Sequence, residues 1–70
     1  MENTLRAQIS QRIKAILKER GLKQQELADS AGMSKSYLSR IIHGTINPTI
    51  ETIEQLEKAL QTHIIIIPWT

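Results

Sequence analysis

The sequence of 70 residues contains no cysteine. This absence excludes disulfide bonds and metal sites built from thiolates. The two histidines, His43 and His63, are far apart in the sequence and have no acidic or cysteine cluster to complete a ligand set. We therefore expect neither a metal nor any other cofactor. A chain of this length forms one domain, and it then depends on regular helix packing and on association with a second copy.

Aromatic residues are nearly absent as well, since the chain has one Tyr, one Trp and no Phe. Twelve Ile and seven Leu supply most of the large apolar side chains, so the expected core is small and aliphatic. An aromatic-lined pocket for a small molecule is not expected. No Ser/His/Asp, Cys/His or paired-carboxylate set falls on a common face. These absences argue against an enzyme.

Long hydrophobic runs are also missing. The longest apolar stretch is the four isoleucines of residues 64–67, whereas a membrane-spanning helix needs about 18 apolar residues. The first residues have neither the basic start nor the apolar run of an export signal. We therefore expect a cytoplasmic protein.

The N-terminal part of the chain is basic, although the net charge of the whole chain is only +2. Residues 3–40 contain eight Lys or Arg and three acidic residues, a net charge of +5, whereas residues 41–70 have a net charge of −2. A basic half favours a nucleic-acid-binding surface. The plainer interpretation is a solvated helix surface.

Residues 4–20 have the features of an amphipathic helix. Five apolar side chains recur at the helical period and share one face. These side chains are Leu5, Ile9, Ile13, Ile16 and Leu17. Gly21 lies where a left-handed residue would end the helix.

Three shorter helices are predicted after it, the first of them over residues 24–30. Ser34 is placed to cap the next, over residues 35–43, and Thr49 to cap the last, which reaches about Gln61. The predicted fold is all-α, with four to five helices in one domain of residues 1–70 and a core in residues 4–61.

The last segment changes from helical spacing to a β-branched run, which predicts a β-strand over residues 62–68 that Pro68 closes. No second strand is predicted in the chain, and an unpaired strand edge promotes aggregation. We therefore expect the strand to pair with its counterpart in a homodimer. The alternative is a tail that folds back over its own core. The residues predicted to make the dimer contact are Ile64, Ile65, Ile66 and Ile67.

Five residues occupy the relative positions 1, 5, 9, 15 and 18 of a helix-turn-helix: Gln24, Ala28, Gly32, Leu38 and Ile41. A small residue at Ala28 lets two helices approach closely, and Gly32 can adopt a left-handed turn. With the loop at residues 44–49, the pattern resembles the Xre/Cro-type helix-turn-helix family of phage and bacterial repressors over residues 5–61. The resemblance implies a lambda-repressor-like fold that binds double-stranded DNA.

In that family, the helix that matches residues 35–43 enters the major groove of DNA. The resemblance implies four base-reading residues, Lys35, Ser36, Ser39 and Arg40. It implies seven phosphate-contacting residues, Lys23, Gln24, Ser34, Tyr37, His43, Thr45 and Asn47. Plainer roles are helix surface for Gln24, a helix cap for Ser34 and packing for Tyr37.

The sequence departs from the family pattern at three positions. Many members pair a basic residue of the first helix with a Glu at the end of the recognition helix, at positions that match Leu17 and Ile42 here. Both are apolar in this chain, so we expect a hydrophobic contact to replace the ion pair at little cost in stability. Lys23 stands where a Thr or Ser cap is usual, which weakens the cap and adds a positive charge that attracts phosphate.

The resemblance implies a sequence-specific transcriptional repressor that acts as a homodimer on a palindromic operator. A short strand followed by an apolar end resembles HipB-type antitoxins, so we expect an autoregulatory antitoxin whose toxin contacts Trp69. Trp69 completing the dimer core is an equal alternative. The alternative function is a phage or plasmid-type repressor without a toxin partner. A protein that coats DNA without sequence choice is disfavoured by the polar donors of residues 35–43.

Overall fold

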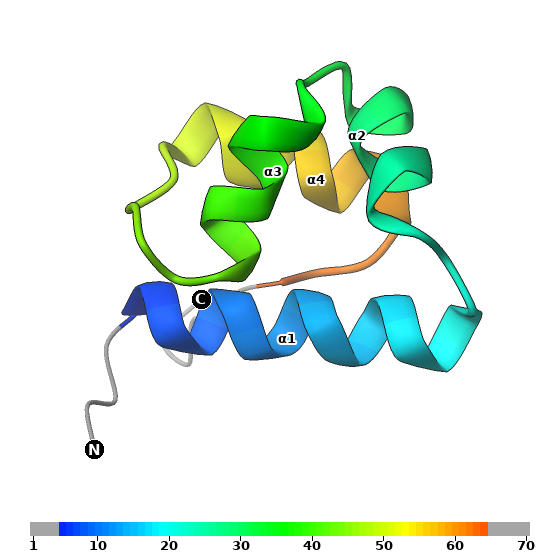
Figure 1. Cartoon of the computed structure of the whole chain (residues 1–70), viewed down its shortest axis with the longest axis horizontal. Helices are drawn as coiled ribbons and strands as arrows, with labels where there is room; N and C mark the ends of the chain where they lie inside the picture. Colours follow the sequence, from blue (N-terminus) through cyan, green and yellow to red (C-terminus); the bar gives the residue numbers. More distant parts are fainter. Residues whose placement is uncertain (1–4, 65–70) are drawn as a thin grey trace.

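The computed structural model describes residues 5–64, which form four helices (Figure 1). The predicted all-α fold is confirmed. The helices are α1 (Leu5–Arg20), α2 (Gln24–Ala31), α3 (Lys35–Ile42) and α4 (Ile50–Leu60). The ends of α2, α3 and α4 differ by one residue from those predicted. Within this part of the chain, no helix is long and apolar enough to cross a membrane.

Helix α1 lies along one side of the molecule, and α2, α3 and α4 pack above it in the view of Figure 1. Helix α3 contacts both α1 and α2, and α2 also packs on α4. One aliphatic cluster joins all four helices. Its buried members are Ile9, Ile13, Ile16, Leu17, Leu27, Ala28, Ala31, Leu38, Ile41, Ile42, Ile53, Leu56, Leu60 and Ile64.

The turn between α2 and α3 has the predicted geometry. Gly32 has a φ of 70°, and the N–H of Met33 donates to the carbonyl oxygen of Ala28 at 3.0 Å, which ends α2. The side chain of Ala28 is fully buried, as close packing of the two helices requires. Both features confirm the helix-turn-helix geometry expected from the sequence.

Helix α2 begins without a side-chain cap at Lys23, as predicted. The backbone N–H of Lys23 instead donates to the carboxylate of Glu26 at 2.9 Å. This hydrogen bond satisfies one N–H group at the start of the helix and leaves the Lys23 side chain exposed to solvent.

The segment after α4 turns back toward α1, as the orange trace in Figure 1 shows. Gln61 adopts a left-handed conformation with a φ of 53°, and the guanidinium of Arg20 donates to the carbonyl of Leu60. Ile64 is buried in the aliphatic cluster, and its N–H donates to Glu57 Oε2 at 2.9 Å. The chain is thus folded onto its own core as far as Ile64.

The predicted strand is not found in residues 62–64, the part of it that the structure describes. The β-branched run favours a strand locally, but the turn at Gln61 and the burial of Ile64 hold the chain in an irregular path. Ile64 therefore fills the core of its own chain. The rest of the predicted strand, residues 65–68, and the predicted contact residue Trp69 lie outside the described residues.

We predict that Gly32→Ala lowers the free energy of unfolding by about 1–2 kcal/mol, because a side chain disfavours positive φ. An added Cβ would meet no atom within 4 Å, so the loss arises from the backbone alone. Gly32→Asn should lose less, since Asn tolerates this conformation better. Urea unfolding at a fixed protein concentration measures the difference. Ser30→Ala, at an exposed position of α2, is the control, and a wild-type stability for Gly32→Ala would contradict the prediction.

Candidate nucleic-acid interface

Helix α3 has one buried side and one exposed side. Leu38, Ile41 and Ile42 are at most 3% exposed and fix the helix against the core. The residues predicted to read bases come from the other side, where Lys35, Ser36 and Arg40 are exposed and Ser39 is half-buried. The structure thus presents three of the four predicted base readers to solvent on one short helix.

Ser34 begins α3 as its cap. Its hydroxyl oxygen accepts a hydrogen bond from the backbone N–H of Tyr37 at 3.1 Å. The capping role weighed from the sequence is confirmed. Ser34 is also exposed, so the same hydroxyl lies at the solvent side of the helix start.

Tyr37 is half-buried and packs against the aliphatic cluster. Its hydroxyl lies 3.2 Å from Thr52 Oγ1 of α4. The packing role considered from the sequence is therefore present in the free chain. The predicted phosphate contact of Tyr37 would use a hydroxyl that already has one partner.

The four carbonyl groups that end α3 all accept hydrogen bonds. The carbonyls of Ser39 and Ile41 accept from the N–H groups of His43, at 2.9 Å, and Gly44, at 3.1 Å. The Arg40 carbonyl accepts from both the N–H and the hydroxyl of Thr45, each at 3.1 Å. The Ile42 carbonyl accepts from the hydroxyl of Ser10 in α1. A phosphate contact at Thr45 would compete with these bonds to Arg40.

His43 follows α3 and is exposed. Its Nδ1 lies 2.7 Å from the carbonyl oxygen of Ser39 and 3.2 Å from the Ser39 hydroxyl. A nitrogen that donates to a carbonyl carries the ring proton, so Nε2 is the nitrogen left for another group. Ser39 thus contacts His43, as their spacing of four residues on one face of a helix predicts.

Three predicted phosphate contacts flank α3 in the sequence. Lys23 is exposed and Gln24 is half-buried at the start of α2, while Asn47 is exposed in the loop between α3 and α4. The start of α2 and one loop thus supply polar groups before and after the recognition helix in the sequence. No contact with DNA tests these assignments, and they remain predictions.

The positive charges of this surface are not neutralised by neighbouring acids. Among residues 5–64, the ion pair found is between His63 and Glu57, whose Nδ1 and Oε2 atoms are 3.8 Å apart. The side-chain charges of Lys23, Lys35 and Arg40 therefore make no ion pair with a carboxylate within the described part of the chain. Unpaired cations favour the approach of a polyanion.

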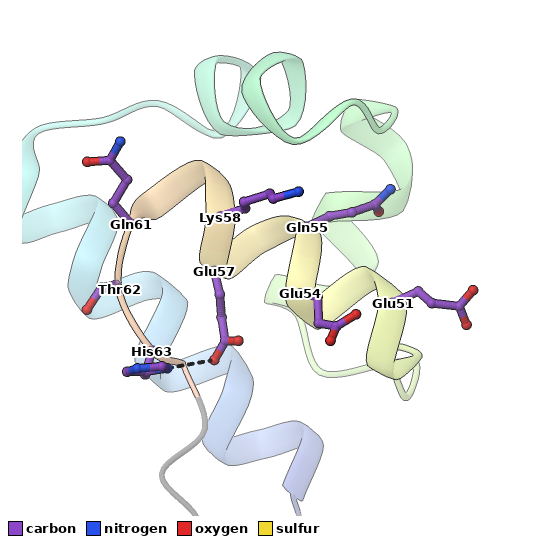
Figure 2. Close-up of a pocket in the computed structure, with 8 residues that line it drawn as sticks. All are labelled: Glu51, Glu54, Gln55, Glu57, Lys58, Gln61, Thr62 and His63. Carbon is purple, nitrogen blue, oxygen red and sulfur yellow. Dashed lines mark ion pairs between the residues drawn. The ribbon is translucent and has the colours of Figure 1, made fainter.

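Three acidic side chains of α4 line the depression drawn in Figure 2. Its lining residues are Glu51, Glu54, Gln55, Glu57, Lys58, Gln61, Thr62 and His63. No residue of α3 belongs to this lining. Three of the acidic residues thus lie on a surface apart from α3, where phosphate groups would be repelled.

Sequence reasoning missed two polar residues that hold α3, Ser10 and Thr52. Both are buried, and each lies next to a core isoleucine in its helix, Ile9 for Ser10 and Ile53 for Thr52. The signal in the sequence was a small hydroxyl residue on the otherwise apolar face of an amphipathic helix. Such a residue needs a hydrogen-bond partner when it is buried.

Comparison with known proteins gives the family. The family model described as helix-turn-helix matches residues 13–67. The immunity repressor of Bacillus phage phi105 is 48% identical over 52 residues, which cover 74% of this chain and 36% of the repressor. The transcriptional regulator SinR of Bacillus subtilis (strain 168) is 42% identical over 57 residues, which cover 80% of this chain and 51% of SinR.

The control protein C.BamHI of Bacillus amyloliquefaciens is 33% identical over 61 residues, which cover 86% of this chain and 75% of that protein. The chain spans between a third and about a half of the length of the phage repressor and SinR. No solved structure matches the chain. The family match, the turn geometry of α2 and α3 and these relatives agree: the chain belongs to the helix-turn-helix family, as a DNA-binding regulator domain of the Xre/Cro type and not an enzyme.

Proposed function

We propose that this chain is a transcriptional repressor that binds a palindromic DNA operator as a homodimer. The observation that carries the proposal is the exposed side of α3, where Lys35, Ser36 and Arg40 lie without a carboxylate partner in the described residues. Helix α3 itself contains no acidic residue. A helix with donors on its exposed side and apolar residues on its buried side suits insertion into the major groove.

Each exposed side chain of α3 has a chemically defined partner on a base edge. The planar guanidinium of Arg40 suits bidentate donation to N7 and O6 of guanine, and the ammonium of Lys35 can donate to the same atoms as a single flexible charge. The hydroxyl of Ser36 can donate or accept, and therefore adds to recognition of either base type. We assign base reading to these three residues.

Phosphate contacts would then come from the groups around α3. Lys23 precedes α2 and Gln24 begins it, Ser34 caps α3, and His43 and Asn47 follow α3. These contacts would fix the position of α3 on the duplex without reading sequence. Tyr37 and Thr45 are the weaker members of the set, because their polar groups have partners within the chain.

The small size of the recognition helix supports a dimer. At about 1.5 Å per residue, the eight residues of α3 extend about 12 Å and reach only a few base pairs. Two copies on half-sites about 34 Å apart would supply the missing affinity and specificity. Because Ile64 is buried in its own core, we assign the dimer contact to residues 65–67.

A repressor without a toxin partner is the version of this function that the relatives favour. The named relatives are an immunity repressor, a transcriptional regulator and a control protein. They support the phage or plasmid-type alternative better than the antitoxin role inferred from the apolar end of the chain. We therefore place the toxin contact at Trp69 outside the proposed function.

We predict that Arg40→Ala weakens binding to the operator by about 1–3 kcal/mol and changes binding to random DNA little, because Arg40 reads a base. The operator is first obtained by selection from random duplexes, and affinities are measured by fluorescence anisotropy. Lys58→Ala is the matched control, since Lys58 is an exposed cation on the acidic side of α4. Equal losses of Arg40→Ala on operator and random DNA would refute base reading.

For Lys23→Ala, we predict equal losses on operator and random DNA, because its ammonium contacts phosphate only. The slope of log affinity against log salt should decrease by about 0.9 for each bound copy. A salt titration on both duplexes measures the slope. A loss confined to the operator would show that Lys23 reads sequence instead.

Deleting residues 65–70 should convert the dimer to a monomer. Ile64 is retained because it fills the core, so the helical content measured by circular dichroism should not change. Equilibrium sedimentation of the full and shortened chains gives their masses. A shortened chain that remains dimeric at the same concentrations would move the interface to residues 5–64.

A further inference from the structure

Two polar side chains are buried within residues 5–64, and both hydrogen-bond to the recognition helix. Ser10 is 5% exposed and Thr52 is 7% exposed, in α1 and α4 respectively. Neither helix belongs to the helix-turn-helix itself, which α2 and α3 form. A buried hydroxyl costs free energy unless it is bonded, so the partners of these two deserve an explanation.

Ser10 holds the C-terminal end of α3. Its hydroxyl donates to the carbonyl oxygen of Ile42, the last residue of the helix. This carbonyl has no partner available within its own helix. The Cβ of Ser10 also lies 3.9 Å from where a Cβ at Gly44 would be, so α1 approaches the turn after α3 closely.

Thr52 holds α3 nearer its start. Its Oγ1 lies 3.2 Å from the hydroxyl of Tyr37 in α3 and 2.9 Å from Oγ1 of Thr49. The Thr49 hydroxyl oxygen in turn accepts the N–H of Thr52 at 3.1 Å, as the cap of α4. A chain of three hydroxyls thus joins α3 to the first turn of α4.

The apolar contacts of α3 do not fix its rotation in the way that these hydrogen bonds do. Leu38, Ile41 and Ile42 stabilise the helix against the core, but hydrophobic contact has no preferred direction. It tolerates small rotations of a helix about its axis. Hydrogen bonds depend steeply on angle, so a bond to the last carbonyl of α3 and a bond to the Tyr37 side chain restrain its rotation and its position along the axis.

We propose that Ser10 and Thr52 are positioning residues that set the orientation of the recognition helix. Loss of either hydroxyl then reduces the discrimination between DNA sequences more than it reduces the stability of the fold. The proposal rests on the proposed function. Lys35 and Arg40 project from the side of α3 opposite the core, and a small rotation of the helix moves their tips furthest. Contacts with phosphate, which carry little directional information, should be much less affected.

The test compares Ser10→Ala and Thr52→Val with wild type on operator and on random duplex of the same length and salt. We expect the ratio of the two affinities to decrease about tenfold in each variant, with an unchanged salt slope. Thr52→Ser keeps the hydroxyl and should restore the ratio. Ile9→Val and Ile53→Val are the matched controls, because each removes a buried methyl group next to the site and no hydrogen bond. They should keep the wild-type ratio.

Amide hydrogen exchange of the free chain provides a readout without DNA. The amides of α3 should exchange faster in Ser10→Ala and Thr52→Val than in whichever control, Ile9→Val or Ile53→Val, has the same global stability. Unchanged discrimination together with unchanged α3 exchange would overturn the proposal, as would equal losses in the valine controls. A wild-type chain that selects no operator would defeat the proposed function instead, while the exchange data would still decide whether these hydroxyls fix α3.

Discussion

Burial of one side of α3 is the interaction on which the rest of the structure depends. Leu38 and Ile41 are almost fully buried and bring α3 into contact with α1 and α2. With this side fixed in the core, Lys35 and Arg40 have only the solvent side to occupy. The same packing that stabilises a small aliphatic core therefore also displays the charged groups that would meet DNA.

The cations of the recognition helix and the acidic residues of α4 lie on different parts of the surface. Lys23, before α2, and Lys35 and Arg40, in α3, lie outside the depression of α4, where Glu51, Glu54 and Glu57 line the surface. A polyanion approaching the domain would be attracted to one surface and repelled by the other. The net charge of +2 is too small to show this preference, which arises from where the helices place the charges.

The helices, their caps and the turn at Gly32 could be predicted because they depend on neighbours within a few residues. The hydrogen bond from Ser10 to Ile42 spans 32 positions of the sequence, and the one between Tyr37 and Thr52 spans 15. Neither bond could be predicted, because these residues meet only through the packing of the helices. At Ile64 a local pattern led to a wrong prediction. Its β-branched neighbours predicted a strand, and burial in the core determined its actual position.

The departure from the family pattern at Leu17 and Ile42 fits a division in which apolar contacts stabilise α3 and hydrogen bonds orient it. Both side chains are buried in the aliphatic cluster, so the hydrophobic replacement of the usual ion pair is consistent with the structure. An ion pair between these helices would have supplied a directional link as well as an attraction. Here Ser10, from the same helix as Leu17, donates to the backbone carbonyl of Ile42 itself. The chain thus keeps a polar link between α1 and the end of α3, carried by a hydroxyl and a carbonyl that need no charge and incur a smaller desolvation cost.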